Sequence, residues 1–281
     1  MAEFTITFAD KLHSKWNRLC FSVRNLLAFT RTGYREVGVN PEELKKWQNS
    51  FPADTQKQIE TLIQKYNFVP QQKFLKLETF QKNLATLWLL DLILNVGSPW
   101  EKYCPLPAGL NVLEAGAHDF SRAPAISAFF ETQKTKNKLI GLELDAYKIL
   151  SDFHSRFDRA QYYAAQVKNS QFLVQNFFTW KEPVDVLFAF YPFVSPHPAI
   201  SWGLPMELGS AGAWVEALIR SVKPDGFALV VHQGEWEEQE FDNAMPFGAF
   251  RLQILQRKTL NCPFYPLPHP AQATLYQLVL T

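Results

Sequence analysis

Two short apolar segments, each with an acidic residue and a glycine near its end, constrain the fold of this chain most strongly. Residues 111–118 read NVLEAGAH, and residues 138–145 read KLIGLELD, with a helix-like run between them. A strand, a turn, a helix and a second strand tipped with a carboxylate form a βαβ unit of the kind that binds nucleotides. We therefore expect a ligand to lie against the first turn, and the carboxylate after the second strand to hold ribose hydroxyls.

The length and composition favour a packed globular fold. The 281 residues fit one large domain, or one domain with a helical extension, and 47% hydrophobic against 20% charged residues predicts a core rather than disorder. The net charge of +1 gives no overall attraction for nucleic acid, although a local basic patch is compatible with it. Neither a signal peptide nor a transmembrane segment is predicted, because the most apolar run, residues 84–96, is too short to span a bilayer.

The cysteines favour a reducing, cytoplasmic setting. Cys20, Cys104 and Cys262 are odd in number and far apart, so neither a disulfide framework nor a metal site is predicted. We expect all three to be small buried hydrophobic residues.

The first helix is predicted from about residue 10, and its apolar side chains recur at helical spacing. This face is formed by Leu12, Trp16, Leu19, Cys20, Val23, Leu26, Leu27 and Thr30. We expect the face to pack against the core of the protein. An alternative is contact with a membrane surface through Trp16, Phe21 and Phe29, with lysines and arginines beside them.

Three further helices are predicted before residue 97. Asn40 is expected to cap the second helix, and Asp54 to cap a third that runs to Phe68. The fourth covers roughly residues 72–95 and stops at the Gly-Ser-Pro run that follows.

From residue 109 onward, short apolar runs alternate with helical patterns. Near-continuous apolar strands between helices indicate a mainly parallel sheet covered on both faces. The last two predicted strands, 250–255 and 274–280, have a Pro-rich connection and no helix between them, so we expect them to pair antiparallel at one edge. We predict a helical subdomain at residues 1–100 and an α/β domain at residues 101–281.

The order of these segments resembles the class I S-adenosylmethionine-dependent methyltransferases. The resemblance covers residues 109–281 and is carried by VLEAG at 112–116, IGLE at 140–143, QFLVQNF at 171–177, VDVLF at 184–188 with YPF at 191–193, and LIRSVKPDGF at 218–227. It implies a doubly wound, seven-stranded Rossmann-like sheet whose last strand is reversed. It also implies a cofactor cleft at the carboxyl ends of the first, second and fourth strands.

The first motif departs from the family pattern at two positions. Where the family usually carries two further glycines, this chain has His118 and Phe120. Histidine accepts a positive φ better than most residues, whereas phenylalanine does not, so these residues predict a reshaped loop. At the fourth strand, Phe190 and Tyr191 replace the polar residue and first proline of amino-group methyltransferases. This change argues against transfer to an adenine or amide nitrogen.

The resemblance implies S-adenosylmethionine as the cofactor and assigns residues to it. Glu143 would hold the ribose hydroxyls, Asn176 and Phe177 would border the adenine, and the first loop would face the methionine end. The full set of expected contacts is Glu114, Gly116, Ala117, His118, Glu143, Leu144, Asn176, Phe177 and Phe190. No metal is expected.

Tyr191 and His197 are the candidates for acid–base work on an acceptor. A neutral histidine near pH 7 can accept a proton from a hydroxyl nucleophile. The expected reaction is methyl transfer to a small or apolar acceptor, through oxygen or carbon. The family also suggests a third interpretation of the first helix, as a lid over the substrate pocket.

Three other functions stay open. The altered loop suggests a non-catalytic module with this fold. Basic residues near the N-terminus suggest an RNA methyltransferase whose phosphate contacts would be Lys11, Arg18, Arg24, Arg31 and Arg35. A nicotinamide-dependent dehydrogenase shares the βαβ unit, but the second-strand spacing and the KPDG turn at 223–226 fit it less well.

Overall fold

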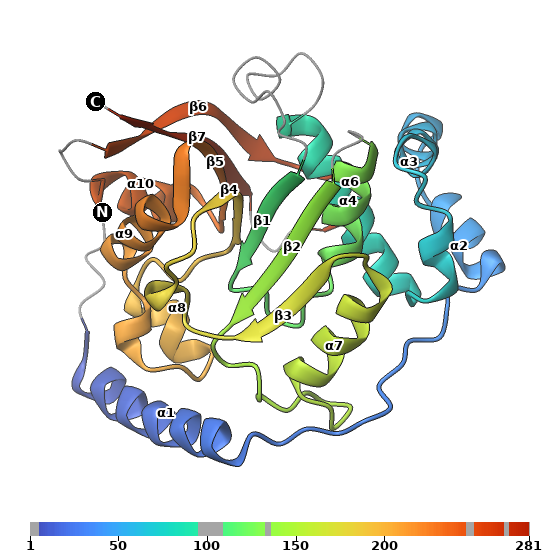
Figure 1. Cartoon of the computed structure of the whole chain (residues 1–281). Coiled ribbons are helices and arrows are strands. Elements are labelled where there is room, and N and C mark those ends of the chain that lie inside the picture. The colour runs from blue at the N-terminus through green and yellow to red at the C-terminus, as the bar shows by residue number, and fades with distance from the viewer. Residues whose placement is uncertain (1–5, 95–108, 133–135, 246–249, 267–269, 281) are drawn as a thin grey trace.

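A seven-stranded sheet forms the centre of the protein (Figure 1). The computed structural model describes residues 6–94, 109–132, 136–245, 250–266 and 270–280. The strand order is β3-β2-β1-β4-β5-β7-β6. The strands are β1 (Gly109–Ala115), β2 (Lys136–Glu143), β3 (Ser170–Val174), β4 (Val184–Phe190), β5 (Val222–His232), β6 (Phe250–Leu260) and β7 (Ala271–Leu280).

The predicted strand directions are confirmed. β1 pairs in parallel with β2 and β4, and β2–β3 and β4–β5 are parallel too. β7 runs antiparallel to both β5 and β6 and lies between them. The reversed last strand expected from the family resemblance is therefore present.

Helices cover both faces of the sheet because alternate strand residues point to opposite sides. On β1, Val112 belongs to the core on one face and Leu113 to the core on the other. The first face is covered by α2 (Pro41–Gln48), α3 (Ala53–Lys65), α4 (Leu77–Leu94), α6 (Ala123–Thr132) and α7 (Arg156–Gln166). The second face is covered by α9 (Ala211–Ser221) and α10 (Glu235–Asn243).

The helices α2 to α4 share a core with the sheet. Leu84, Leu87 and Leu90 of α4 are fully buried, and α4 packs against α6. The 28–40 segment is tied to α4 and α7 by Glu36, which accepts hydrogen bonds from Thr79 of α4 at 2.7 Å and Tyr163 of α7 at 2.8 Å. The proposed division at residue 100 stays a prediction, and residues 95–108 lie outside the described structure.

Two predicted helix starts are corrected by the structure. Asn40 caps α2 as expected, since its side chain accepts from the backbone N–H of Glu42. Asp54 does not cap α3: the cap is Pro52, and Asp54 lies in the first turn and complements the helix dipole. The fourth predicted helix is divided, with a 3-10 turn at Pro70–Lys73 before α4 begins at Leu77.

The first helix, α1 (Phe8–Leu27), contradicts the expected core packing. Leu12, Trp16 and Leu19 of the predicted apolar face are 59%, 63% and 55% exposed. The buried side of α1 is polar, because Ser14 is its buried residue. The helix lies beyond the carboxyl ends of the central strands (Figure 1), next to the short helix α8 (Pro196–Ser201).

Two of the cysteines differ in burial. Cys262 is buried as expected and burial raises its pKa to about 11, whereas Cys20 is only half-buried. Cys104 lies outside the described residues. None of the helices in the described ranges is long and apolar enough to cross a membrane.

Candidate cofactor and acceptor site

A cavity of about 370 Å³ opens where β1, β2 and β4 end. Strand order reverses at β1, which has β2 on one side and β4 on the other, and open α/β sheets bind ligands at such a switch point. The cavity is lined by Gly116 after β1, Glu143 at the end of β2 and Phe190 at the end of β4. Its size lies within the range of small-molecule sites.

The loop after β1 keeps the backbone of a glycine-rich turn. Gly116, His118 and Phe120 have φ of 68°, 56° and 58°, in the left-handed region that glycine favours. The loop closes on β2 through a hydrogen bond of 2.8 Å from the N–H of Ala117 to the carbonyl of Leu142. The expected reshaping therefore does not extend to the backbone torsions, and the change lies in the side chains.

Gly141 accommodates the unusual Phe120. A Cβ atom at Gly141 would lie 2.5 Å from Cδ2 of Phe120, which is closer than two carbons can pack. The missing side chain in β2 therefore opens the space for the Phe120 ring, which is fully buried and packs near Phe172 with ring centroids 5.9 Å apart. This core packing offsets the strain of a phenylalanine at positive φ.

Two backbone N–H groups orient the carboxylate of Glu143. His118 donates to Oε2 at 2.9 Å and Asp145 donates to Oε1 at 2.8 Å. Arg156 Nη1 lies 3.7 Å from Oε1, which makes an ion pair but is too far for a hydrogen bond. Each carboxylate oxygen has two lone-pair sites, so one on each oxygen is left for a ligand. The carboxylate thus suits a pair of neighbouring hydroxyls.

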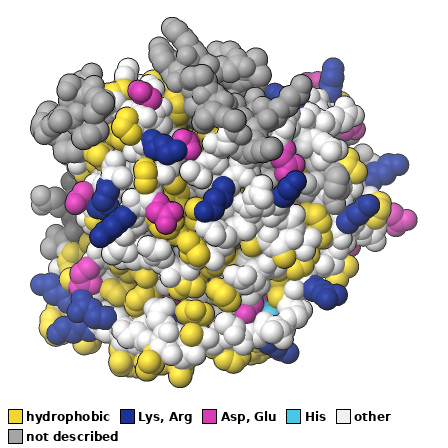
Figure 2. All heavy atoms as spheres, in the orientation of Figure 1, with side chains coloured by type: hydrophobic (Ala, Val, Ile, Leu, Met, Phe, Trp, Pro, Cys, Tyr) yellow, Lys and Arg dark blue, Asp and Glu magenta, His cyan; other side chains and the backbone are white. Residues whose placement is uncertain are grey.

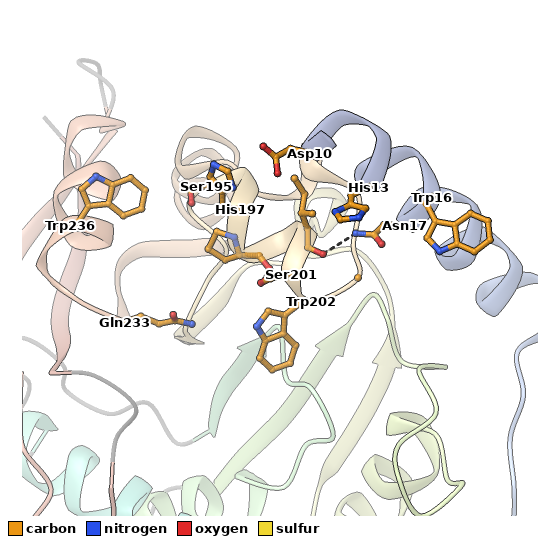
Figure 3. A pocket seen from close by; sticks show the side chains of 13 residues that line it. Asp10, His13, Trp16, Asn17, Ser195, His197, Ser201, Trp202, Gln233 and Trp236 are labelled. Carbon is orange, nitrogen blue, oxygen red and sulfur yellow. Dashed lines mark hydrogen bonds between the residues drawn. The ribbon is translucent and has the colours of Figure 1, made fainter. Parts of the chain in front are cut away.

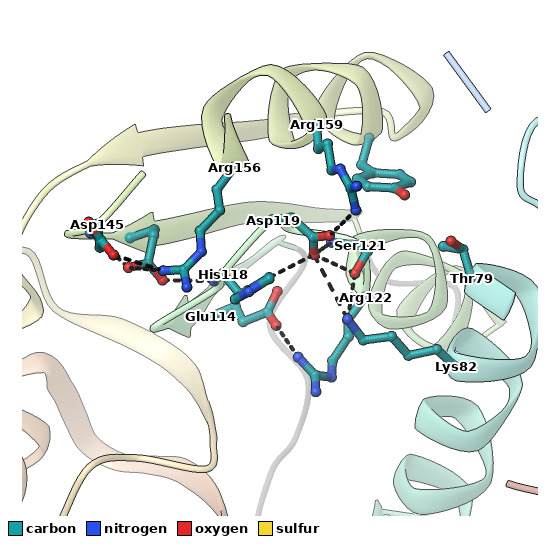
Figure 4. Close-up of polar contacts among 12 residues, drawn as sticks. Thr79, Lys82, Glu114, His118, Asp119, Ser121, Arg122, Asp145, Arg156 and Arg159 are labelled. Carbon is teal, nitrogen blue, oxygen red and sulfur yellow. Dashed lines mark hydrogen bonds and ion pairs between the residues drawn. The ribbon is translucent and has the colours of Figure 1, made fainter. Parts of the chain in front are cut away.

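A buried ionic network surrounds the first loop (Figure 4). Asp119 accepts from Ser121 Oγ at 2.6 Å and lies 3.8 Å from Lys82 Nζ and 3.7 Å from Arg159. Burial acts to raise the pKa of Asp119. The nearby Lys82 ammonium and hydrogen bonds from His118 and Ser121 lower that pKa well below its usual value. Because Lys82 lies on α4 and Arg159 on α7, the network fixes the loop to both helices.

Glu114 is buried beneath the cavity beside Arg122. Burial raises the pKa of this glutamate to about 7, and the guanidinium lies 3.8 Å away. Neither carboxylate oxygen has a hydrogen-bond partner among the described residues. The guanidinium of Arg122 also lies over the Phe190 ring, 4.6 Å from its centroid, and it lines the cavity.

Aromatic side chains form the wall beyond β3. Phe177 begins a short 3-10 turn (Phe177–Thr179), and its ring lies 5.1 Å from that of Trp214 of α9. Asn176 caps this turn by accepting from the N–H of Phe178 at 2.9 Å. The indole N–H of Trp214 is buried and has no acceptor among the described residues.

The structure brings most of the predicted residues together around the cavity. Those that line it are Gly116, His118, Glu143, Leu144, Asn176, Phe177, Phe190 and Tyr191. Glu114 and Ala117 are not among the lining residues: Glu114 is fully buried, and Ala117 serves the loop closure. His197 is also outside the lining of this cavity.

His197 lines a second, more open groove of about 810 Å³ (Figure 3). The groove lies between α1, α8 and α10 and meets the cavity at Trp202 and Gln233, which line both. Its other aromatic walls are Trp16 and Trp236. Its titratable lining, among the described residues, consists of Asp10, His13 and His197, without a lysine or arginine.

The segment around α8 covers the cavity and is held by α1. Trp202 packs edge-on against His118, with ring centroids 5.9 Å apart. Asn17 of α1 donates from Nδ2 to the carbonyl oxygens of Ile200 at 2.9 Å and Leu204 at 3.1 Å. This arrangement supports the alternative interpretation of α1 as part of a lid.

Comparison with known proteins gives fold-level likenesses. No protein-family profile and no curated protein matches the sequence. Solved structures that match include a Listeria monocytogenes protein assigned to the class I S-adenosylmethionine-dependent methyltransferases, at 13% identity over 71% of this chain and 59% of that one, with a TM-score of 0.46. Another is magnesium protoporphyrin IX methyltransferase of Synechocystis with bound S-adenosylmethionine, at 13% identity, 72% and 80% coverage and a TM-score of 0.41.

A third structure is a Pyrococcus horikoshii protein assigned as an RNA methyltransferase, at 12% identity, 72% and 83% coverage and a TM-score of 0.43. The strand order found here, with antiparallel β7 between β5 and β6, decides the architecture. The chain has the class I methyltransferase fold.

Several residues of this methyltransferase-fold site were not predicted from the sequence. They are Lys82, Arg122, Arg156, Gln175, Trp202, Trp214 and Gln233. Lys82 and Trp214 lie on helices whose order along the chain does not reveal which side chains reach the sheet edge. Gln175 follows β3 directly and Gln233 follows β5 directly, so their positions at strand ends were an available signal.

Proposed function

We propose that this protein transfers a methyl group from S-adenosylmethionine to a small, uncharged acceptor. The observation that carries the proposal is the cavity at the switch point of the sheet, where the Gly116 loop and the Glu143 carboxylate face one space. In open α/β sheets this edge holds the ligand. The sequence resemblance then favours S-adenosylmethionine over a nicotinamide dinucleotide.

The residues around the cavity fit this cofactor chemically. The open lone pairs of Glu143 suit the two ribose hydroxyls, and the Phe177 and Trp214 rings suit a planar base. Lys82 and Arg122 line the same cavity and would hold the carboxylate of the methionine end. Arg122 is ion-paired with the buried Glu114 at 3.8 Å but donates no hydrogen bond to it, so its N–H groups can still bind a second carboxylate.

The bound cofactor would supply a methyl group on an activated sulfonium. The protein then has to position an acceptor and exclude water, and positioning alone gives large accelerations in such displacements. Trp202, Leu204 and Leu208 lie over the cavity and serve the exclusion of water.

The groove beside the cavity supports an uncharged, aromatic or apolar acceptor. Three tryptophans line it, and the carboxylate of Asp10, which lines it together with His13 and His197, disfavours a phosphate or carboxylate on the acceptor. The acceptor would enter through the groove and reach the cavity between Trp202 and Gln233.

Tyr191 and His197 would take different roles. Burial raises the pKa of Tyr191, so its hydroxyl stays protonated at neutral pH and can donate a hydrogen bond to the acceptor. Tyr191 also has a strained φ of 58°, as residues in functional sites often do. His197 lines the groove and is the candidate to accept a proton from a hydroxyl nucleophile.

The proposal is tested by transfer of a radiolabelled methyl group from S-adenosylmethionine into fractions of a small-molecule cell extract. We expect label to enter an uncharged fraction, and we expect His197→Gln to lower kcat with little change in cofactor affinity. The exposed Glu182 offers a matched control, and Glu182→Gln should leave both unchanged. Absence of cofactor consumption with every fraction would contradict methyl transfer.

The two remaining alternatives have distinct signatures. A non-catalytic module would bind the cofactor without transferring its methyl group. The hypothesis of RNA methylation is weakened because two of the five candidate phosphate contacts are in ion pairs, Arg18 with Glu207 and Arg24 with Asp145. RNA binding that falls steeply with salt would revive it.

A further inference from the structure

The helix α1 turns its apolar face outward. Phe8, Leu12, Trp16 and Leu26 are 83%, 59%, 63% and 85% exposed, and Leu19, Val23 and Leu27 lie on the same face. In the space-filling view, hydrophobic side chains gather along the lower edge, where α1 lies (Figure 2). A run of exposed large hydrophobic residues on one helix marks an interaction surface.

Polar contacts fix this orientation. Asn17 donates to two carbonyl groups of the α8 segment, and Ser14 Oγ accepts from the N–H of Met206 at 2.9 Å. Arg24 pairs with the buried Asp145 at 2.9 Å. Rotating the helix to bury its apolar face would break these contacts, so the outward face belongs to the stable fold.

The apolar surface continues beyond the helix. Phe29, Ile149 and Phe153 are 48%, 48% and 70% exposed and line a shallow depression together with Arg31. Segments from two separate parts of the chain therefore contribute to one surface.

Cations flank this surface. Lys11 and Lys15 are exposed, are separated by one helical turn, and make no ion pair with any described residue. Arg18 lies on the same flank and pairs with Glu207. The one acidic residue of α1, Asp10, is held at the opposite side by Thr7 at the helix cap.

We infer that α1, together with the adjoining surface formed by Phe29, Ile149 and Phe153, docks on an anionic lipid bilayer. An exposed apolar helix face with Trp and Phe, flanked by lysine and arginine, is the pattern of helices that lie in a membrane interface. The cationic flank complements anionic headgroups. Antiparallel pairing of α1 with a second copy would instead bring the two lysine flanks together without an acidic partner.

Docking also brings the groove to the membrane, because Trp16 belongs to both the apolar face and the groove lining. An apolar acceptor could then enter directly from the lipid. This last consequence rests on the proposed function, whereas the docking does not.

The test is sedimentation of the full-length protein with vesicles, without cofactor. We expect binding to vesicles of phosphatidylcholine mixed with phosphatidylglycerol and weaker binding to phosphatidylcholine alone. Leu19→Asp should weaken binding about tenfold or more, since it replaces an exposed leucine that would enter the bilayer with a carboxylate. Val69→Asp, at a residue that is 53% exposed beside α3, is the matched control and should bind as the wild type does.

The double variant Lys11→Gln/Lys15→Gln should abolish the preference for anionic vesicles. Because all of these positions are exposed, the variants should fold, and circular dichroism checks that they do. Failure of the wild-type protein to bind either vesicle, or equal binding by Leu19→Asp, would overturn the inference. The inference would also be overturned if the protein formed a dimer that Leu19→Asp dissociates and did not bind vesicles. RNA binding that is lost in the same variant would overturn it too.

Discussion

At the scale of single residues, the first loop depends on a pair of residues that are distant in sequence. Phe120 occupies a glycine-like conformation because Gly141 leaves room for its ring. Residues 112–120 by themselves predicted a reshaped loop, because the residue that makes room for Phe120 lies on the next strand. The same reading did identify Gly116 and Glu143, because strand ends in this fold converge at one edge.

The Gly141–Phe120 contact gives a double-mutant prediction. Gly141→Ala places a Cβ atom against the buried ring, so it should destabilise the fold by about 1–3 kcal/mol. With Phe120→Gly present, the same change should cost much less. Urea unfolding measures both values, and Gly212→Ala, where the nearest atom is 4.0 Å away, serves as the control. Equal costs in the two backgrounds would disprove the compensation.

Glu114 predicts a specific pH dependence of stability. Burial raises the pKa of its carboxyl from 4.5 to about 7, so between these pH values the folded protein retains a proton that the unfolded chain releases. This contribution makes the free energy of unfolding fall as pH rises from 4.5 to 7, by on the order of 3 kcal/mol.

Glu114→Gln should remove that contribution and be more stable than the wild type at pH 8. Urea unfolding at pH 5 and pH 8 measures it. Glu78→Gln, at an exposed glutamate, should show the wild-type pH dependence. A Glu114→Gln variant with an unchanged difference between the two pH values would show that Glu114 titrates normally.

At the scale of elements, α1 shows what amphipathic periodicity leaves open. The spacing of Leu12, Trp16 and Leu19 predicted the helix, and its capping box at Thr7 starts it within two residues of the expected position. The pattern identifies an apolar face but not the partner of that face. Here hydrogen bonds from the polar face to the α8 segment decide the orientation.

The hold of α1 on the α8 segment is testable through Asn17. Asn17→Ala leaves the carbonyls of Ile200 and Leu204 without their donor, so the segment over the cavity should open more often. Hydrogen exchange of residues 196–208 should be about tenfold faster or more. Asn25→Ala removes a hydrogen bond within α1 and should leave that exchange unchanged. Slow exchange in Asn17→Ala would mean that other contacts hold the lid.

At the scale of the whole molecule, the sequence predicted the strands and their covering helices. It did not predict which N-terminal helices pack on the sheet and which one lies outside its core. The apolar runs separate into seven strands, and the missing helix before 271–280 indicated the reversed strand. The sequences of α4, which is part of the sheet's core, and α1, which lies outside it, do differ: α1 carries five charged residues and α4 carries three among more apolar ones. What the apolar face of an amphipathic helix such as α1 contacts is decided by tertiary contacts, and here it is left exposed.

This difference predicts unequal costs for the same truncation. Leu87→Ala in α4 removes a fully buried side chain and should cost about 2–5 kcal/mol. Leu12→Ala in α1, where the leucine is 59% exposed, should change stability by less than about 0.5 kcal/mol. Urea unfolding followed by tryptophan fluorescence gives both values. A small cost at Leu87 would show that α4 forms a separate unit that unfolds without the sheet.

The central claim is that the cavity at the ends of β1, β2 and β4 holds S-adenosylmethionine. Calorimetric titration of S-adenosylmethionine and S-adenosylhomocysteine into the wild type and Glu143→Ala tests it most directly. We predict micromolar binding of both ligands to the wild type and a loss of about tenfold or more in Glu143→Ala, because the ribose hydroxyls lose a charged acceptor. Glu182→Ala should bind as the wild type does. No binding to the wild type, or equal binding to Glu143→Ala, would contradict the claim.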